Sequence, residues 1–432
     1  MRLCPGRLLP IHESSYNRAA ILPENAVALP KTAWLCLGLF GLWQGGAQAQ
    51  TEIELWHRFS DARAAVLTEL ARDFNASQAA YRVHPVAKNS EPDLVHAALD
   101  AQRKGKPPHL LQLDQISGMS LAAQRNAYRP VQLVLQEAGQ NQNFNNFLPG
   151  IMDSSVDTLG RVISLPLGVS SVAFYFNRAL LDKAGLPSVD RMRTWRDVQA
   201  AALRVIDSEA AACAYASDSQ AWVLVENVLA MHDQPYTERS GPYSHVSALS
   251  FSNRLLVRHV GMLSSWAKSG IFSYFGPQSE ASERFAAGEC AMLSGSSSLY
   301  PRLSATLGTQ LVMQPLPVYD DFSSPNSRAL SSGSSLWVLA GRDRKDYKGV
   351  GLFLAFLSRA DRQAHWHQVT GDLPLTLQAY ETTRKAGFYQ QNPWGEIAIR
   401  STRSNARAPR IDPPLPQIGR IRAILNQELE AV

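Results

Sequence analysis

Residues 285–300 (FAAGECAMLSGSSSLY) constrain the fold more than any other part of the sequence. They contain the end of a predicted helix, a stop at Gly288, a short apolar strand, and then Ser296, Ser297 and Ser298. A helix does not continue cheaply through glycine, and a serine run cannot fill a hydrophobic core. We therefore expect this strand to deliver its serines to the edge of a ligand-binding cleft.

A second segment, residues 330–338 (LSSGSSLWV), has the same composition: serines next to an apolar strand. Either segment alone is weak evidence, because a run of serine and glycine is more often a plain loop than a binding edge. The two segments would meet at one place only if the chain crossed between two lobes. Two domains also suit a chain of 432 residues, which exceeds what one hydrophobic core usually serves.

The chain after residue 50 alternates strand and helix patterns, which predicts a three-layer α/β lobe with a parallel sheet. The predicted strands are residues 51–56, 81–86 and 110–113, and the helices are residues 61–75 and 96–103. Ligands of such sheets lie beyond the carboxyl ends of the strands. The candidate positions there are Trp56, His57, Ser90, Asp114 and Gln115.

Residues 160–176 (GRVISLPLGVSSVAFYF) contain two apolar segments interrupted at Pro166 and Gly168. We interpret them as a crossing between lobes, with Ser170 and Ser171 at the bend. An ordinary hairpin fits the same pattern equally well. A second α/β pattern follows, from about residue 170 to residue 300, and the chain after Gly387 is expected to be irregular.

Residues 34–49 resemble a secretory signal: an apolar run of ten residues, 34–43, follows Lys31, and Ala47-Gln48-Ala49 comes after it. The run is too short to span a bilayer. We predict export to the periplasm with cleavage after Ala49, and a true start codon downstream of Met1. The alternative is a buried helix. Cleavage would leave Cys213 and Cys290, and the sequence does not decide whether they pair.

Charge and motifs argue against several functions. The net charge of +5 falls to +3 without residues 1–49, and a charge this small does not by itself indicate nucleic-acid binding. The serine runs lack the second glycine of a nucleophile elbow. His365 and His367 are two positions apart on a predicted helix, so they point to different sides and cannot bind one metal unaided. We expect no catalytic residue, cofactor or metal. Serine hydroxyls with a C-terminal arginine fork instead suit a small anionic ligand.

The mature chain resembles the extracytoplasmic solute-binding proteins of ABC importers, within the large sugar-type group, and most closely those that bind glycerol 3-phosphate. The motifs that carry the resemblance are WH at 56–57, LPLGVSSVAFYFN at 165–177, AGLP at 184–187, TWRD at 194–197, GECAM at 288–292, SGSSLWV at 332–338, WHQVTGDLPLT at 366–376 and GFYQQNP at 387–393. The resemblance implies two α/β lobes of the type II periplasmic-binding-protein fold, each a sheet flanked by helices, joined by crossing hinge strands. We expect residues 50–166 and 301–342 in the N-terminal lobe, and residues 167–300 and 343–432 in the C-terminal lobe.

The family's ligand positions carry over at Ser170, Ser296, Gly333 and a C-terminal arginine, which we place at Arg422 with Arg420 as the alternative. Other family positions differ in this chain. Ser90 and Asp372 stand where the family has tyrosine, and Gln115 where it has glutamate. Ser219 replaces the first tryptophan of a WQGW motif, and the second remains as Trp222. Asp372 would repel a phosphate unless it binds a hydroxyl or a cation of the ligand.

The resemblance implies a monomeric solute-binding subunit that delivers glycerol 3-phosphate, or a glycerophosphodiester such as glycerophosphocholine, to inner-membrane permease subunits. Two alternatives remain: a binder of neutral oligosaccharides, and a periplasmic glycerophosphodiester hydrolase.

Overall fold

The computed structural model describes residues 50–89, 93–157, 159–186, 188–239, 247–322, 328–402 and 417–431. The predicted signal segment with its cleavage after Ala49, and the candidate ligand residue Ser90, lie outside these ranges.

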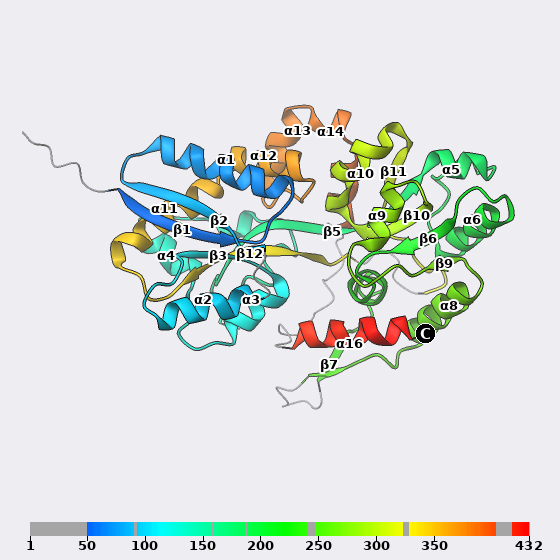
Figure 1. The fold of residues 1–432 in the computed structure, drawn as a ribbon, viewed down its shortest axis with the longest axis horizontal. Coiled ribbons are helices and arrows are strands. Elements are labelled where there is room, and N and C mark those ends of the chain that lie inside the picture. The colour runs from blue at the N-terminus through cyan, green and yellow to red at the C-terminus, as the bar shows by residue number, and fades with distance from the viewer. Residues whose placement is uncertain are drawn as a thin grey trace, which may run out of the picture. The chain divides into compact units, whose positions relative to one another are not determined.

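The first part of the chain forms the predicted parallel strands. β1 (Thr51–His57) lies between β2 (Tyr81–Ala87) and β3 (Leu110–Asp114), and pairs in parallel with both. The connections are α1 (Ala62–Ser77) and α2 (Leu94–Arg103), which lie on opposite faces of these strands (Figure 1). Local sequence starts α1: the Asp61 carboxylate accepts a hydrogen bond from the Arg63 backbone N–H at 3.0 Å.

Two long strands continue the sheet beyond β3. β12 (Ser331–Leu339) pairs antiparallel with β3, and β5 (Leu165–Asn177) pairs antiparallel with β12. The far end of β5 pairs with β10 (Cys290–Ser296) and β11 (Leu311–Gln314). The predicted crossing is therefore confirmed and the hairpin alternative is wrong, because β5 runs from one half of the sheet into the other (Figure 1). The complete sheet is mixed rather than parallel.

The predicted interruption at Pro166 and Gly168 is wrong, because both residues lie inside β5. Gly168 is an extra residue in the pairing: Gly333 of β12 faces Val169, whereas Ser334 faces Leu167. Gly168 has a φ of 76°, a left-handed conformation that glycine adopts without steric cost. The glycine therefore marks a bulge in a continuous strand.

The second half of the sheet adds β6 (Cys213–Ser217) and β9 (Phe272–Ser273) beyond β10. It is covered by α5 (Arg178–Lys183), α6 (Trp195–Asp207), α8 (Arg254–Lys268) and α9 (Glu280–Ala286). Thr194 caps α6 and forms a reciprocal capping box with Asp197. Buried aromatic residues fill this part of the core: Trp195, Tyr215 and Trp266. A small separate sheet pairs β7 (Thr237–Arg239) with β8 (Ser247–Leu249).

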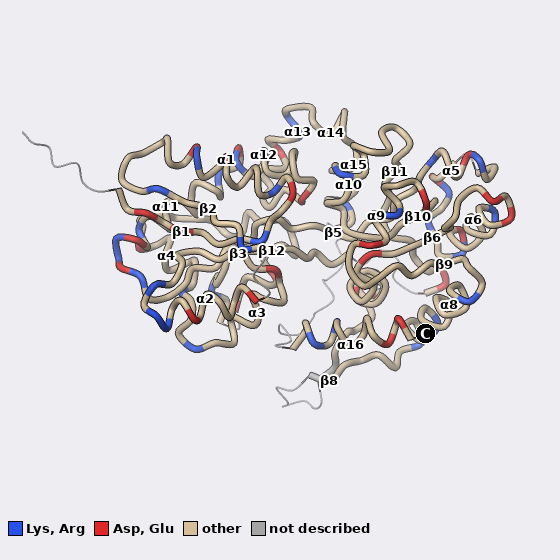
Figure 2. The backbone as a smooth tube through the Cα atoms, in the orientation of Figure 1, with Lys and Arg blue, Asp and Glu red and all other residues tan. Residues whose placement is uncertain are grey.

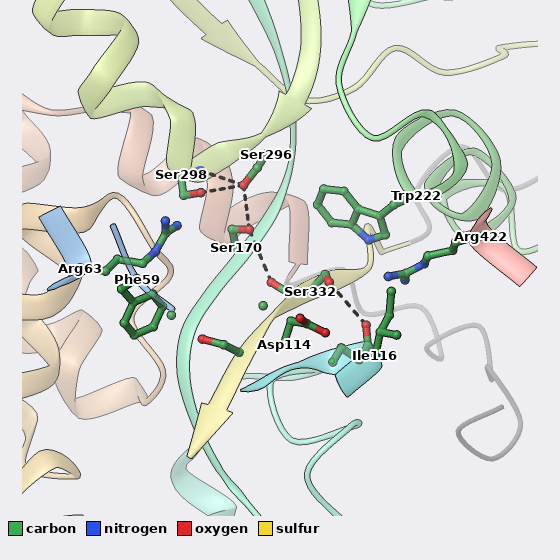
Figure 3. A pocket seen from close by; sticks show the side chains of 14 residues that line it. Phe59, Arg63, Asp114, Ile116, Ser170, Trp222, Ser296, Ser298, Ser332 and Arg422 are labelled. Atoms are coloured by element: carbon green, nitrogen blue, oxygen red, sulfur yellow. Dashed lines mark hydrogen bonds between the residues drawn. The ribbon is translucent and has the colours of Figure 1, made fainter. Parts of the chain in front are cut away.

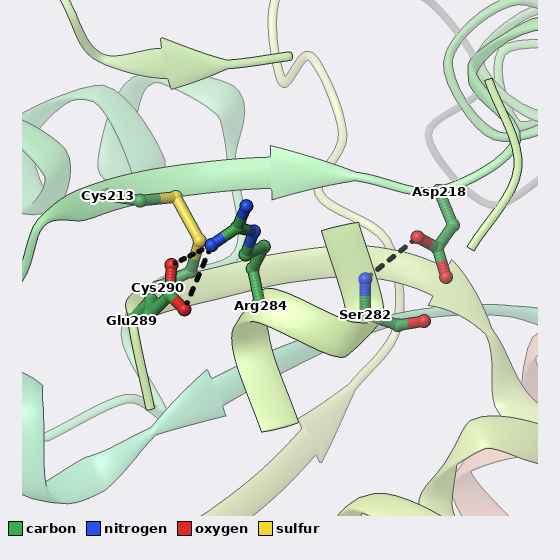
Figure 4. Close-up of a disulfide and its surroundings, with 6 residues drawn as sticks. All are labelled: Cys213, Asp218, Ser282, Arg284, Glu289 and Cys290. Atoms are coloured by element: carbon green, nitrogen blue, oxygen red, sulfur yellow. Dashed lines mark hydrogen bonds and ion pairs between the residues drawn. A yellow bond between two sulfur atoms is a disulfide. The ribbon is translucent and has the colours of Figure 1, made fainter. Parts of the chain in front are cut away.

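Cys213 and Cys290 form a disulfide, which settles the alternative that the sequence left open (Figure 4). The two cysteines face each other in the register of β6 and β10, with their Cα atoms 4.4 Å apart. The bond therefore ties together the strand that carries Ser296 and its parallel neighbour.

The remaining helices correct the expectation of an irregular C-terminus. α14 (Phe388–Gln391), α15 (Trp394–Thr402) and α16 (Ile418–Glu430) follow Gly387. The other elements are α3 (Gln115–Ala122), β4 (Tyr128–Arg129), α4 (Val131–Glu137), α7 (Asn227–Met231), α10 (Tyr300–Leu307), α11 (Arg344–Leu357), α12 (Ala360–Thr370), α13 (Leu377–Lys385), the π-helix η2 (Ala221–Glu226), and the 3-10 turns η1 (Phe144–Asn146), η3 (Ser297–Leu299) and η4 (Gly308–Gln310).

The expected division of the chain into two lobes stays a prediction. Two segments, however, pack against the other half of the sheet from the one expected. α11 packs on β1 and α4, and α12 packs on α1, so these helices join the half of the sheet that begins the chain. α10 and β11 instead pack with the other half, because β11 pairs with the far end of β5.

Charged residues of both signs are interspersed along the described backbone (Figure 2). Within the described ranges, no helix combines the length and the apolar character that crossing a bilayer requires.

Candidate functional site

A cavity of about 320 Å³ lies where β5 and β12 cross between the two halves of the sheet. Its walls come from segments far apart in the sequence: the turn after β1, the start of α1, the start of α3, strands β5 and β12, the end of β10 with the turn that follows it, the π-helix η2, and α16. Six predicted ligand residues line it: Ser170, Ser296, Gly333, Arg422, Gln115 and Trp222 (Figure 3). Serines from both predicted segments, residues 285–300 and 330–338, therefore lie at the same cavity, as predicted from the sequence.

Hydroxyl groups form a connected patch on one wall. Ser296 Oγ donates to Ser170 Oγ at 2.8 Å and also accepts from the Ser298 backbone N–H at 3.2 Å. Its Oγ lies 2.7 Å from the Oγ of Ser298. The patch joins strand β5 to the turn that follows β10. Polar atoms arranged in this way can exchange their mutual hydrogen bonds for bonds to a polar ligand.

Gly333 allows the two crossing strands to approach closely at the cavity. A Cβ atom at this position would lie 2.2 Å from the carbonyl oxygen of Gly168 and 2.7 Å from the Cα of Val169. These contacts are backbone contacts that cannot move aside. The glycine is therefore required for the strand crossing itself, whether or not it also contacts a ligand.

Arg422 of α16 enters the cavity held by a buried carboxylate. Its Nε and Nη2 donate to the two oxygens of Glu226 at 2.7 and 2.6 Å, and the Glu226 side chain is only 1% exposed. Burial lowers the pKa of Arg422, but Glu226 outweighs it, so this pKa is raised above the usual value of arginine. The bidentate pair fixes one edge of the guanidinium, and among the described residues Nη1 has no hydrogen-bond partner. The alternative residue, Arg420, is exposed and does not line the cavity.

The π-helix η2 supplies both Glu226 and the aromatic wall residue Trp222. The Trp222 carbonyl accepts a hydrogen bond from the Asn227 side chain at 3.1 Å, which helps to satisfy the wider turn. Short π-helical segments are frequent at functional sites.

Gln115 starts α3 directly after β3, as the strand-end argument predicted. Its Oε1 accepts from the Ser332 hydroxyl at 3.4 Å. The preceding residue, Asp114, caps α3 by accepting from the Ser117 N–H at 2.8 Å, and it remains exposed on the cavity wall.

Asp372 differs from the expectation that it faces the ligand. It is fully buried behind the cavity wall, and its carboxylate accepts from Arg63 Nε at 2.9 Å and Nη2 at 2.8 Å. Trp366 Nε1 adds a third hydrogen bond, at 3.0 Å. Because both oxygens of Asp372 are occupied by Arg63, the carboxylate does not repel an anion as an isolated charge would. The residue that reaches the cavity is Arg63.

Arg63 and Phe59 are wall residues that the sequence reasoning missed. Phe59 follows β1, so the strand-end rule could have included it. Arg63 looks like a solvent-facing residue in the first turn of a helix, and nothing local signals its partner.

At the opposite end of β6 from the disulfide, Asp218 follows the strand and lies beside the strand that ends at Ser296 (Figure 4). Its Oδ1 accepts from the Ser282 backbone N–H at 2.9 Å. Burial raises the pKa of Asp218 to about 6, although this hydrogen bond and Arg302 oppose the shift. Among the described residues there is no group of three or more His, Cys, Asp or Glu that could hold a metal ion.

Sequence comparison assigns the chain to a family. The model of the family "Bacterial extracellular solute-binding protein" matches residues 69–393. The chain belongs to this family. Its members are binding proteins, so the cavity is a candidate solute-binding site.

Individual relatives extend the match over nearly the whole chain. An sn-glycerol-3-phosphate-binding periplasmic protein UgpB of Yersinia pestis bv. Antiqua (strain Antiqua) is 33% identical over 410 residues, which cover 92% of this chain and 91% of the relative. UgpB of Rhizobium meliloti (strain 1021) is 35% identical over 392 residues, 89% of this chain and 90% of the relative. Among solved structures, UgpB of Mycobacterium tuberculosis in complex with glycerophosphocholine has a TM-score of 0.72 at 18% identity, covering 88% of this chain and 93% of that one. This structural likeness confirms the predicted type II fold.

Proposed function

We propose that this protein is the periplasmic solute-binding subunit of an ABC importer, and that it captures sn-glycerol 3-phosphate or a glycerophosphodiester. The observation that carries the proposal is the convergence of hydroxyls and a guanidinium from separate segments on one cavity: Ser170, Ser296 and Arg422. Hydroxyl donors and an arginine fork are the groups that recognise a phosphate ester. The names of the relatives point in the same direction.

Export and delivery complete the proposal. The signal segment would be removed after Ala49, and the mature chain would release its ligand to permease subunits in the inner membrane. Ligand would bind more tightly to the closed arrangement of the cavity walls, and this difference in affinity would drive closure. Bending of β5 and β12 would accompany closure, because these strands join the two halves of the sheet.

A thermal-shift screen tests the ligand class. The exported protein is heated with glycerol 3-phosphate, glycerophosphocholine, glycerol or maltose. A ligand present at 100 times its Kd stabilises the folded protein by about 2.7 kcal/mol, which raises the melting temperature measurably. We expect a shift with one or both phosphate esters and none with glycerol. A shift with maltose alone would contradict the proposal and favour the oligosaccharide alternative.

A further inference from the structure

Arg63 and Arg422 are held in the same manner although they belong to different helices. Each donates from Nε and Nη2 to both oxygens of one buried carboxylate: Asp372 for Arg63 and Glu226 for Arg422. The side chains of Asp372 and Glu226 are 0% and 1% exposed. A bidentate carboxylate fixes a guanidinium in direction as well as in place.

The two guanidiniums approach the cavity from different sides. Figure 3 shows Arg63 on the side of Ser298 and Ser170, and Arg422 on the side of Trp222 and Ile116. The Arg63 side chain is 21% exposed, so it is neither fully buried nor a free surface group. Its Nη1 donates to Asp61 at 2.6 Å. With three of its five N–H groups used in these bonds, the guanidinium keeps donor capacity for a ligand.

Charge explains why Asp372 is compatible with an anionic ligand. A buried carboxylate on its own would disfavour a phosphate nearby, and it would be costly to desolvate. Burial also lowers the pKa of Arg63, but Asp372 and Asp61 outweigh this effect and raise it. Arg63 therefore stays protonated at the cavity wall, and the buried Asp372 carboxylate stabilises the protonated form.

We infer that Arg63 is a second anion-binding residue of this site. It contacts the phosphoryl group of the ligand together with the hydroxyls of Ser170, Ser296 and Ser298, while Arg422 approaches from the other side. Asp372 is a positioning residue that acts through Arg63. The inference rests on the proposed function and refines it, because two guanidiniums favour a dianionic phosphate monoester over a monoanionic diester.

The paired variant Arg63→Met with Asp372→Asn separates ligand binding from structural pairing. It removes both charges, so no unpaired charge stays buried, and the new amide can still accept from Trp366. Calorimetric titration with glycerol 3-phosphate is expected to give a Kd about 10-fold or more above that of the unmodified protein. The weakening of this binding by added salt should also become less steep. Arg384→Met, which removes an exposed arginine outside the cavity wall, is the matched control and should leave the Kd unchanged.

A Kd for the paired variant within twofold of the unmodified value, with the same salt dependence, would overturn the inference. Arg63 would then serve only to neutralise Asp372. Should the paired variant fail to fold, Arg63→Lys keeps the charge and loses the fork; we expect a several-fold weaker Kd, and an unchanged Kd would again overturn the inference. If the unmodified protein binds no phosphate ester at all, the proposed function itself fails and the inference falls with it.

Discussion

At the scale of single residues, the cavity wall combines serine hydroxyls with two guanidinium groups. Each guanidinium is paired with a buried carboxylate. Arg422 and Arg63 line the cavity and are each paired with a buried acid, so removing either arginine alone would leave a buried charge unpaired as well as change the cavity wall. A substitution of one partner therefore changes both the stability of the protein and the wall of the cavity. Variants that remove both members of a pair avoid this confusion.

Arg422→Ala should destabilise the protein because it leaves Glu226 buried without its partner. Breaking a buried pair from one side typically costs about 3–5 kcal/mol in the free energy of unfolding. Urea unfolding of the variant and of the unmodified protein measures this cost. Adding Glu226→Gln to the variant should recover most of the loss. Equal stability of Arg422→Ala and the unmodified protein would contradict the pairing.

Asp218 should give the protein a specific pH dependence. Its pKa is about 6 in the folded protein against 3.8 for an unperturbed group, so between these values the folded state binds more protons than the unfolded state. The contribution of Asp218 to the free energy of unfolding therefore falls as the pH rises from about 4 to about 6.

Asp218→Asn removes this titration. The stability of the variant relative to the unmodified protein should therefore be higher at pH 7 than at pH 4, by at most about 3 kcal/mol. Urea unfolding at the two pH values measures the change. The new amide oxygen can still accept from the Ser282 N–H. A relative stability that is the same at both pH values would show that Asp218 does not titrate in this way.

Part of the site could be predicted from residues alone. The serine runs and the crossing segment led to Ser170 and Ser296, and the resemblance added Gly333 and Arg422. Arg63 could not be found, because its partner Asp372 lies 309 positions away and only the fold brings the two together. The paired state of Asp372 was missed for the same reason.

At the scale of elements, the antiparallel pairing of β5 with β12 builds one wall of the cavity. The two strands approach so closely at Gly333 that a Cβ atom there would clash with the backbone of β5. Gly168 has a positive φ, in which an ordinary side chain would be strained. The bulge at Gly168 shifts the register of the pairing, and the serines of both strands then reach one wall.

Gly333→Ala should disrupt this crossing. Because the added methyl group would meet backbone atoms at 2.2 and 2.7 Å, the strands would have to separate. We expect a loss of about 1–3 kcal/mol in the free energy of unfolding, together with weaker ligand binding. Gly261→Ala in α8 is the matched control: a Cβ there meets nothing within 4 Å, and the substitution should be neutral or stabilise by up to about 1 kcal/mol. A Gly333→Ala protein as stable as the control would contradict the close approach.

Elements with strong local signals were predictable, and those set by distant contacts were not. α1 and α6 have capping residues and buried apolar faces that the sequence displays. The serines of β12 lie inside the strand rather than before it, because pairing with β5 satisfies their backbone groups. α16 was missed because arginines and prolines near it suggested an irregular tail, although its Ile418 is buried and its Arg422 pairs with Glu226.

At the scale of the whole molecule, one sheet runs through both halves, and the candidate site lies where β5 connects them. One buried apolar cluster also extends across both halves, because it contains Leu55 of β1 and Leu293 of β10. A site at this position senses both halves at once, which suits a protein that signals occupancy by changing the arrangement of its parts. The family assignment and the geometry of the cavity both fit capture of a solute.

Calorimetric titration with glycerol 3-phosphate, comparing the unmodified exported protein with the paired variant Arg422→Met and Glu226→Gln, tests the central claim most directly. We predict saturable binding at one site in the unmodified protein, and a Kd raised about 10-fold or more in a paired variant that remains folded. Absence of binding to the unmodified protein, or the same Kd in both proteins, would contradict the account.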